Sequence, residues 1–162
     1  MSIELKELKE LIASFEEWIS FTNLLQQISE ETWNSSIEQG KWTVKDIVSH
    51  IMLWDKYFYE EAIEKIASDK PVTLRHLNYD DFNSEAIEYG KTITTNELLE
   101  KAVFYRKKII GDISSLSEET VNRSYLDGSG HVFSIPQYLK DFIWHDQHHM
   151  VPLKEYLKTI HA

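Results

Sequence analysis

Residues 3–28, IELKELKELIASFEEWISFTNLLQQI, decide the fold class of this chain. Apolar side chains recur in this stretch at steps of three and four residues, which places them on one face of an α-helix. They are Leu5, Leu8, Leu11, Ile12, Phe15, Ile19 and Leu25. A helix with one apolar stripe buries that stripe against other elements, so the stretch predicts the first helix of an all-α protein.

Most of the remaining sequence has the same helical periodicity, and only five glycines and three prolines interrupt it. A second helix is expected from Thr43 to about Ala67, because Thr43 can cap it, Asp46 stands near the capping-box position and Pro71 follows its end. A third helix is expected over 95–116, beginning at Thr95 or Asn96. These patterns indicate several long helices in succession.

A fourth helix is expected to begin at Ser134, because Pro136 is tolerated in a first helical turn. Residues 72–90 form a polar crossover with one short helix around 82–88, and Asp127-Gly128-Ser129-Gly130 is a flexible loop at the mouth of a site. Four long helices with one long crossover predict a four-helix bundle. The second and fourth helices can face each other across its core.

Length and charge restrict the class of protein. We expect one domain over 1–162, long enough to bury a core without disulfides. The 27 acidic and 17 basic residues give a formal charge of −10, which opposes binding to nucleic acid and to anionic membrane surfaces. There is no cysteine for a disulfide, a thiolate metal site or a nucleophile. No apolar run is long enough for a membrane span or a signal peptide, so we expect a cytoplasmic protein.

The segment Trp144-His145-Asp146-Gln147-His148-His149 carries the first functional signal. His145 and His149 are four residues apart and therefore share one face of a helix. His50 lies in a comparable segment of the second helix, on a face that its apolar neighbours indicate is buried. A single histidine is more often a hydrogen-bonded structural group than a ligand. Three histidines that converge are candidate ligands for one divalent ion.

The other four histidines are weaker candidates for metal ligands. His148 lies about 100° around the helix from His149 and is assigned to a supporting or surface position. His76 and His161 lie in a polar segment and at the terminus, where we expect them to be solvated. His131 follows the glycine-rich loop and is a candidate for the rim of a pocket.

Other catalytic motifs fit less well. His145-Asp146-Gln147-His148-His149 resembles the HExxH zinc protease helix, but aspartate replaces the catalytic glutamate and few residues follow to supply another ligand. A di-iron bundle needs two Glu-x-x-His motifs, which this sequence lacks. It also lacks a nucleophile elbow and a glycine-rich phosphate loop. A mononuclear three-histidine site is the motif that remains.

Over nearly the whole chain, the sequence resembles the DinB/YfiT-like superfamily of bacterial bundle proteins. The resemblance rests on Gly40-Lys41-Trp42-Thr43-Val44-Lys45-Asp46-Ile47-Val48-Ser49-His50 followed by Trp54, on the glycine-rich loop before Ser134, and on His145 and His149. It implies a four-helix bundle, usually a homodimer, in which His50, His145 and His149 bind a divalent metal, often zinc or nickel. Members with known activity include bacillithiol S-transferases and mycothiol-dependent maleylpyruvate isomerase. Pro152 departs from the family pattern and is expected to loosen or kink the last helix.

Three neutral imidazoles leave the charge of a bound dication intact and leave a coordination position open. We therefore expect a metal-dependent enzyme, of S-transferase or hydrolase type, that activates a low-molecular-weight thiol or water for attack on an electrophilic small molecule. Asp46 and Asp141 stand one turn before His50 and His145, and are candidates for orienting those rings or handling protons. Trp54, Tyr57 and Tyr138 are candidates for the pocket wall.

Two alternatives stay open from the sequence. One is a metal-stabilised dimer without catalysis that serves as an interaction or stress-response module. The other is a degenerate family member that binds no metal. An exchangeable metal position facing an open pocket would favour the enzyme, whereas a closed shell of four ligands would favour a structural ion.

Overall fold

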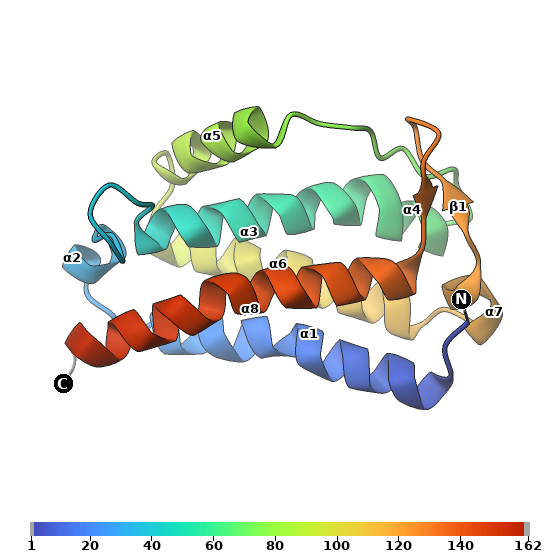
Figure 1. Cartoon of the computed structure of the whole chain (residues 1–162), viewed down its shortest axis with the longest axis horizontal. Helices are drawn as coiled ribbons and strands as arrows, with labels where there is room; N and C mark the ends of the chain where they lie inside the picture. The colour runs from blue at the N-terminus through green and yellow to red at the C-terminus, as the bar shows by residue number, and fades with distance from the viewer. Residues whose placement is uncertain (1, 161–162) are drawn as a thin grey trace.

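Four long helices lie side by side along the molecule in the computed structural model, which describes residues 2–160 (Figure 1). They are α1 (Leu5–Leu25), α3 (Val44–Phe58), α6 (Thr95–Ser114) and α8 (Ile135–Ile160). α3 continues through a π-helical segment, η1 (Tyr59–Ile63), into α4 (Glu64–Ala67). α3 packs against α6, and α1 packs against both α6 and α8. The predicted all-α four-helix bundle is confirmed.

Side-chain caps fix where two of these helices begin. The Thr43 hydroxyl accepts a hydrogen bond from the Asp46 backbone N–H at 3.1 Å, and the Asp46 carboxylate accepts one from the Thr43 N–H at 3.0 Å. This pair is the capping box that the sequence indicates. The cap of α6 is Thr94, which accepts from the backbone N–H of Glu97 at 3.1 Å. Thr95 is therefore the first residue of α6, as expected.

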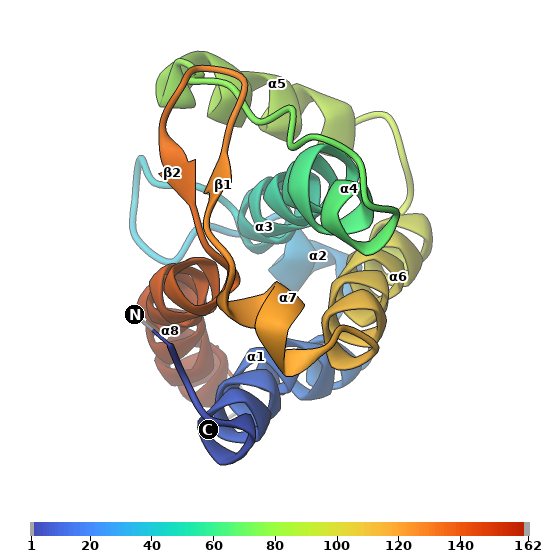
Figure 2. The same ribbon diagram turned by 90° about the vertical axis from the view of Figure 1, so that its right-hand side faces the viewer.

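The shorter elements connect the long helices: α2 (Glu30–Trp33), α5 (Tyr79–Gly90), α7 (Glu118–Asn122) and an antiparallel hairpin of β1 (Tyr125–Leu126) and β2 (Val132–Phe133). α5 is longer than the helix expected over 82–88, because the Asn78 side chain caps it by accepting from the Asp81 N–H at 3.0 Å. The glycine-rich loop is the turn of the hairpin, which stands at one end of the bundle (Figure 2). There it contacts the crossover, where the Gly128 N–H donates to Leu74 O at 2.6 Å.

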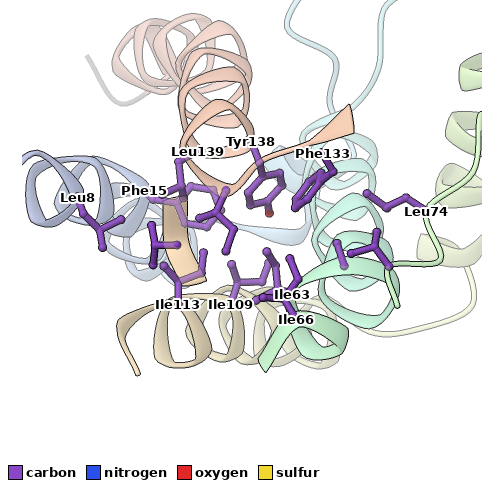
Figure 3. Close-up of a cluster of buried hydrophobic side chains, with 14 of the residues drawn as sticks. Leu8, Phe15, Ile63, Ile66, Leu74, Ile109, Ile113, Phe133, Tyr138 and Leu139 are labelled. Atoms are coloured by element: carbon purple, nitrogen blue, oxygen red, sulfur yellow. The ribbon is translucent and has the colours of Figure 1, made fainter. Parts of the chain in front are cut away.

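The apolar core has two parts that follow one another along the bundle axis. One lies toward the hairpin and includes Phe15, Ile63, Ile109, Phe133 and Tyr138 (Figure 3). The other lies toward the opposite end and is built from a different set of side chains, among them Trp18, Phe21, Val48, Met52, Leu98 and Met150. Each part receives residues from all four long helices, so both hold the same bundle together.

A buried charged network links the four helices at the level where the two apolar parts meet. Arg106 of α6 is fully buried and forms two hydrogen bonds each with the carboxylates of Asp55 on α3 and Asp146 on α8, at 2.8–3.2 Å. It also donates to the backbone carbonyl of Phe15 on α1 at 2.8 Å. The guanidinium carbon lies 3.8 Å from the centre of the Phe15 ring. We name Asp55, Arg106 and Asp146 the arginine network.

α8 continues through Pro152 as one helix to Ile160. Across residues 2–160, no helix combines the length and the apolar character that crossing a bilayer would require.

Candidate metal centre and its pocket

His50 projects from α3, and His145 and His149 project from α8, into one cluster. Their potential ligand atoms all lie within 4.8 Å of one another, and Nε2 of His50 is 3.0 Å from Nε2 of His145. Three nitrogens that each stand about 2.1 Å from a tetrahedral ion are roughly 3.4 Å apart. The cluster therefore has the dimensions and the ligand type that one divalent ion requires. The structure brings together all three of the predicted ligands.

Asn83, from α5, sets the orientation of His50. Its side-chain oxygen lies 2.8 Å from Nδ1 of His50 and 2.9 Å from Nε1 of Trp54. The indole N–H of Trp54 can only donate, so the atom facing both rings is the acceptor oxygen of the amide. Nδ1 of His50 therefore carries the proton, and Nε2 presents a lone pair to the cluster. This is the tautomer that a metal ligand needs.

Burial keeps the cluster neutral. It lowers the pKa of His50 to about 4 and that of His149 to about 3, and in both cases repulsion from neighbouring imidazoles adds to the effect. Burial also lowers the pKa of His145. Nδ1 of His145 is buried without a hydrogen-bond partner among the described residues. Three neutral imidazoles with converging ring nitrogens form a donor set that a cation would stabilise.

Trp42 covers one side of the cluster. Its ring centre lies 4.9 Å from that of His50 and 6.3 Å from that of His149, with the second pair stacked at 19°. Two of the three rings, His50 and His145 but not His149, also line a pocket of about 830 Å³ that Trp42 does not line. An ion held by the three rings would thus have one face covered by protein and one face toward the pocket.

The pocket lies between α3 and α8 and ends beneath the hairpin. Its walls are largely aromatic: Trp54, Phe58, Tyr79, Phe133, Tyr138, Phe142 and Trp144. Trp54 and Tyr138 line it as expected, whereas Tyr57 lines a smaller neighbouring hollow together with His76 and His131. Both of these histidines are exposed, and His161 lies outside the described residues.

The two predicted supporting aspartates occupy different surroundings. The carboxylate of Asp46 belongs to the capping box of α3, and His50 has Asn83 as its partner instead. Asp141 is exposed, lines the pocket and accepts a hydrogen bond from the side chain of Gln137 at 2.8 Å. A role for Asp141 in proton transfer stays a prediction.

The histidine segment itself separates into inward and outward positions. His148 is exposed and stacks on Trp144 with ring centres 5.2 Å apart. Its ring also meets that of His149 edge-on at 5.2 Å, but its nitrogens are not among the converging ligand atoms of the cluster. Asp146 points into the core, where its carboxylate belongs to the arginine network. It is therefore engaged with Arg106, in agreement with the weak match to the zinc protease motif.

Comparison with known proteins identifies the relatives of this chain. A candidate metal-dependent hydrolase of Bacillus licheniformis is 23% identical over 135 residues, which is 83% of this chain and 75% of that protein. The structure of YfiT from Bacillus subtilis, described as a candidate metal-dependent hydrolase with an unusual four-helix bundle topology, matches with a TM-score of 0.78 at 15% identity. That match covers 98% of this chain and 90% of YfiT.

A mycothiol-dependent maleylpyruvate isomerase has the same fold, with a TM-score of 0.69 at 16% identity over 90% of this chain and 60% of the isomerase. The sequence profile of the DinB superfamily matches residues 13–151. Because this match extends over most of the sequence, the chain belongs to the DinB superfamily.

Proposed function

We propose that this protein is a metal-dependent enzyme that activates a small thiol or a water molecule for attack on an electrophilic small molecule. One observation carries the proposal: two residues of the three-histidine cluster, His50 and His145, line a pocket large enough for a small organic molecule. A structural ion would need no such access. Two relatives are named as candidate metal-dependent hydrolases, which supports a metal-dependent reaction for this protein as well.

The roles of the residues follow from their positions. His50, His145 and His149 would hold the ion, for which zinc and nickel are the expected choices, and Asn83 keeps His50 in the ligating tautomer. A bound divalent ion would supply Lewis acidity, which makes a coordinated thiol or water more acidic. Because this chain has no cysteine, a thiol would have to arrive as a cosubstrate. The aromatic walls exclude water from the reacting groups and so strengthen electrostatic interactions there.

Metal analysis of protein purified without a histidine tag tests the first half of the proposal. We expect about one divalent ion per chain. Substitution of His50, His145 or His149 by alanine should lower the metal content strongly in each case. His148→Ala is the matched control, because His148 is exposed and borders His149 without contributing a nitrogen to the group of converging ligand atoms. Equal metal loss in His148→Ala and His149→Ala would contradict the assignment of ligands.

Activity measurements test the second half. Wild type, His149→Ala and metal-stripped protein are compared with chlorinated, epoxide and ester electrophiles, using bacillithiol, glutathione or water as the nucleophile. The rate should follow metal occupancy and exceed the rate with free metal. If no nucleophile gives a rate above free metal, the protein is better described as a non-catalytic metal-stabilised module. The expected homodimer is a separate proposal, which the molecular mass in solution tests.

A further inference from the structure

The charges around the pocket restrict what it can accept. Within residues 2–160, no lysine or arginine lines this pocket, and its one carboxylate is that of Asp141. Arg75 lines only the smaller neighbouring hollow. The whole chain also carries a formal charge of −10. An anionic group in the part of the pocket remote from the histidines would therefore lie in a negative field without a basic side chain to pair with it.

The polar side chains of the pocket do not compensate for the missing cation. The amide of Asn122 is engaged with the backbone of Ile3 and Glu118. The amide of Gln137 donates to Asp141. The remaining donors, such as the Tyr138 hydroxyl, which has no hydrogen-bond partner among the described residues, are uncharged. A carboxylate of a ligand would therefore meet neutral donors but no cation, and burying an unpaired charge is costly. Aromatic faces beside a carboxylate, in contrast, favour cations.

The pocket is elongated. His50, Trp54 and Phe58 stand at successive turns of α3, and eight residues of helix extend about 12 Å. His145 and Gln137 bound the facing wall on α8 over the same length. An occupant with its reactive group at the histidines would place its other end beside Phe58, Gln137 and the hairpin.

We propose that the substrate is an elongated, largely apolar and aromatic molecule that is uncharged or positively charged at the end remote from the histidines, and that molecules with a carboxylate at that end are rejected. This inference rests on the proposed function, because it places the reactive group of the substrate at the histidine cluster. Nucleophiles that carry carboxylates, such as glutathione, would have to keep those groups outside the pocket.

Three matched probes test the inference on the zinc-loaded full chain: benzohydroxamic acids that carry a methyl, an aminomethyl or a carboxymethyl group opposite the hydroxamate. The hydroxamate is a zinc ligand in all three, so they differ only in the substituent at the remote end, which is neutral, cationic or anionic. Dissociation constants are measured by calorimetry. We expect the methyl and aminomethyl probes to bind at least about tenfold more tightly than the carboxymethyl probe, which would bury an unpaired charge.

Two variants locate the effect. Gln137→Lys places a cation at the remote end of the pocket and should reduce the discrimination against the carboxymethyl probe several-fold. Gln27→Lys adds the same charge at an exposed position that does not line the pocket, and should leave the discrimination unchanged.

The failures are distinguishable. Equal affinity of wild type for all three probes would overturn the inference while leaving the metal site and the proposed function intact. The inference would fail in the same way if Gln27→Lys changed the discrimination as much as Gln137→Lys, because the effect would then belong to the net charge. If no probe binds more tightly to wild type than to His149→Ala, the metal position facing the pocket is refuted, and with it both proposals.

Discussion

The side-chain oxygen of Asn83 accepts hydrogen bonds from two rings, and this arrangement fixes the tautomer of His50. Trp54 Nε1 and His50 Nδ1 both point at that oxygen, at 2.9 and 2.8 Å. The two donors are held by α3 and the acceptor by α5. The lone pair on His50 Nε2 therefore depends on how the crossover packs against the bundle.

We expect Asn83→Leu to weaken metal binding by about 10- to 100-fold, because it removes the partner that fixes the ring and its tautomer. Asn83→Asp keeps an acceptor in place and should retain the affinity or increase it. Competition against a chromophoric chelator measures both. Asn23→Leu, an exposed change on α1, is the control. Wild-type affinity in Asn83→Leu would show that the hydrogen bond does not support the site.

The histidine pKa values predict how the stability of the metal-free protein depends on pH. The folded-state pKa values of His50 and His149 are lowered to about 4 and about 3, from 6.5. Between these values and pH 6.5 the unfolded chain binds more protons, so the free energy of unfolding should fall as pH decreases from about 6.5 to about 4. Burial raises the pKa of Asp55 to about 6, so protonation of this group increases the free energy of unfolding as pH decreases and offsets part of the loss from the histidines.

Urea titrations of stripped protein across this pH range measure the slope. His149→Ala removes one of the two strongly lowered histidines and should give a shallower dependence than wild type. A free energy of unfolding that rises on acidification, or an identical slope in wild type and His149→Ala, would refute the prediction.

The three metal-site histidines were predictable from their spacing along the sequence. The residues that hold them in place were not, because they come from segments that only tertiary packing brings together. His145 and His149 are four apart on one helix, and His50 lies on an apolar face, so their convergence needs only the bundle. Asn83 comes from a crossover whose path depends on packing between segments. Arg106 interrupts the apolar stripe of α6, which marks it as unusual, but its two carboxylate partners come from other helices.

At the scale of elements, α5 is the segment that sequence patterns describe least well. Its helical surface is polar, so the sequence predicts only a short helix at 82–88. Three contacts with α3 settle its actual position. Phe82 stacks on Trp54 with ring centres 3.9 Å apart, and the Ser49 hydroxyl donates to the carbonyl of Ala86 at 2.5 Å. Gly90 completes the set, because it lies directly against Ser49.

Gly90→Ala should separate α5 from α3. A Cβ atom at this position would lie 2.9 Å from both Cβ and Oγ of Ser49, so one helix would have to move. We expect a loss of about 1–3 kcal/mol in the free energy of unfolding, as for overpacked positions, and weaker metal binding through the displacement of Asn83. Urea titration and the chelator competition measure the two effects.

Gly111→Ala is the matched control. It lies within α6, and a Cβ there would meet nothing within 4 Å. The higher helix propensity of alanine should stabilise this variant by up to about 1 kcal/mol. If Gly90→Ala has the same free energy of unfolding as Gly111→Ala, the close approach of α5 to α3 does not hold the crossover in place.

The hairpin shows a second limit of pattern reasoning. Strands of two residues are too short to show an alternating pattern, and the sequence indicates only a loop at residues 127–130. None of the loop residues 127–130 lines the pocket, whereas Val132 and Phe133 of the following strand do. Asp127 lines the smaller neighbouring hollow. The glycines therefore predicted a loop at this point of the chain, but not the strand pairing that brings Phe133 to the pocket wall.

At the scale of the whole molecule, the four-helix bundle follows from the long apolar stripes, because each helix can bury its stripe only against the others. The stripes do not explain the arginine network. Three charged side chains with a net charge of −1 lie between the two apolar parts of the core, and they bind all four long helices to one another. Apolar packing alone permits helices to slide or rotate, whereas this network requires one alignment.

Replacement of Arg106 by methionine tests what the network contributes. The apolar part of the side chain is kept, but the carboxylates of Asp55 and Asp146 lose their counter-charge in the core. Breaking a buried pair in this way costs about 3–5 kcal/mol, so the free energy of unfolding should fall by that amount. Arg106→Lys should also be destabilised, because an ammonium group cannot make paired hydrogen bonds to two carboxylates.

Two further variants identify the cause of the loss. If it comes from unpaired carboxylates, changing Asp55 and Asp146 to asparagine in the Arg106→Met background should recover a large part of it. Arg123→Met removes an exposed arginine whose ion pair with Glu119 spans 3.4 Å, and should change the stability by less than about 1 kcal/mol. Urea titrations at pH 7 compare all of them. If Arg106→Met unfolds at the same urea concentration as Arg123→Met, the network does not hold the bundle together. If the triple variant is no more stable than Arg106→Met, the loss comes from the missing packing and hydrogen bonds of the guanidinium group, and the charges of the two aspartates are not its cause.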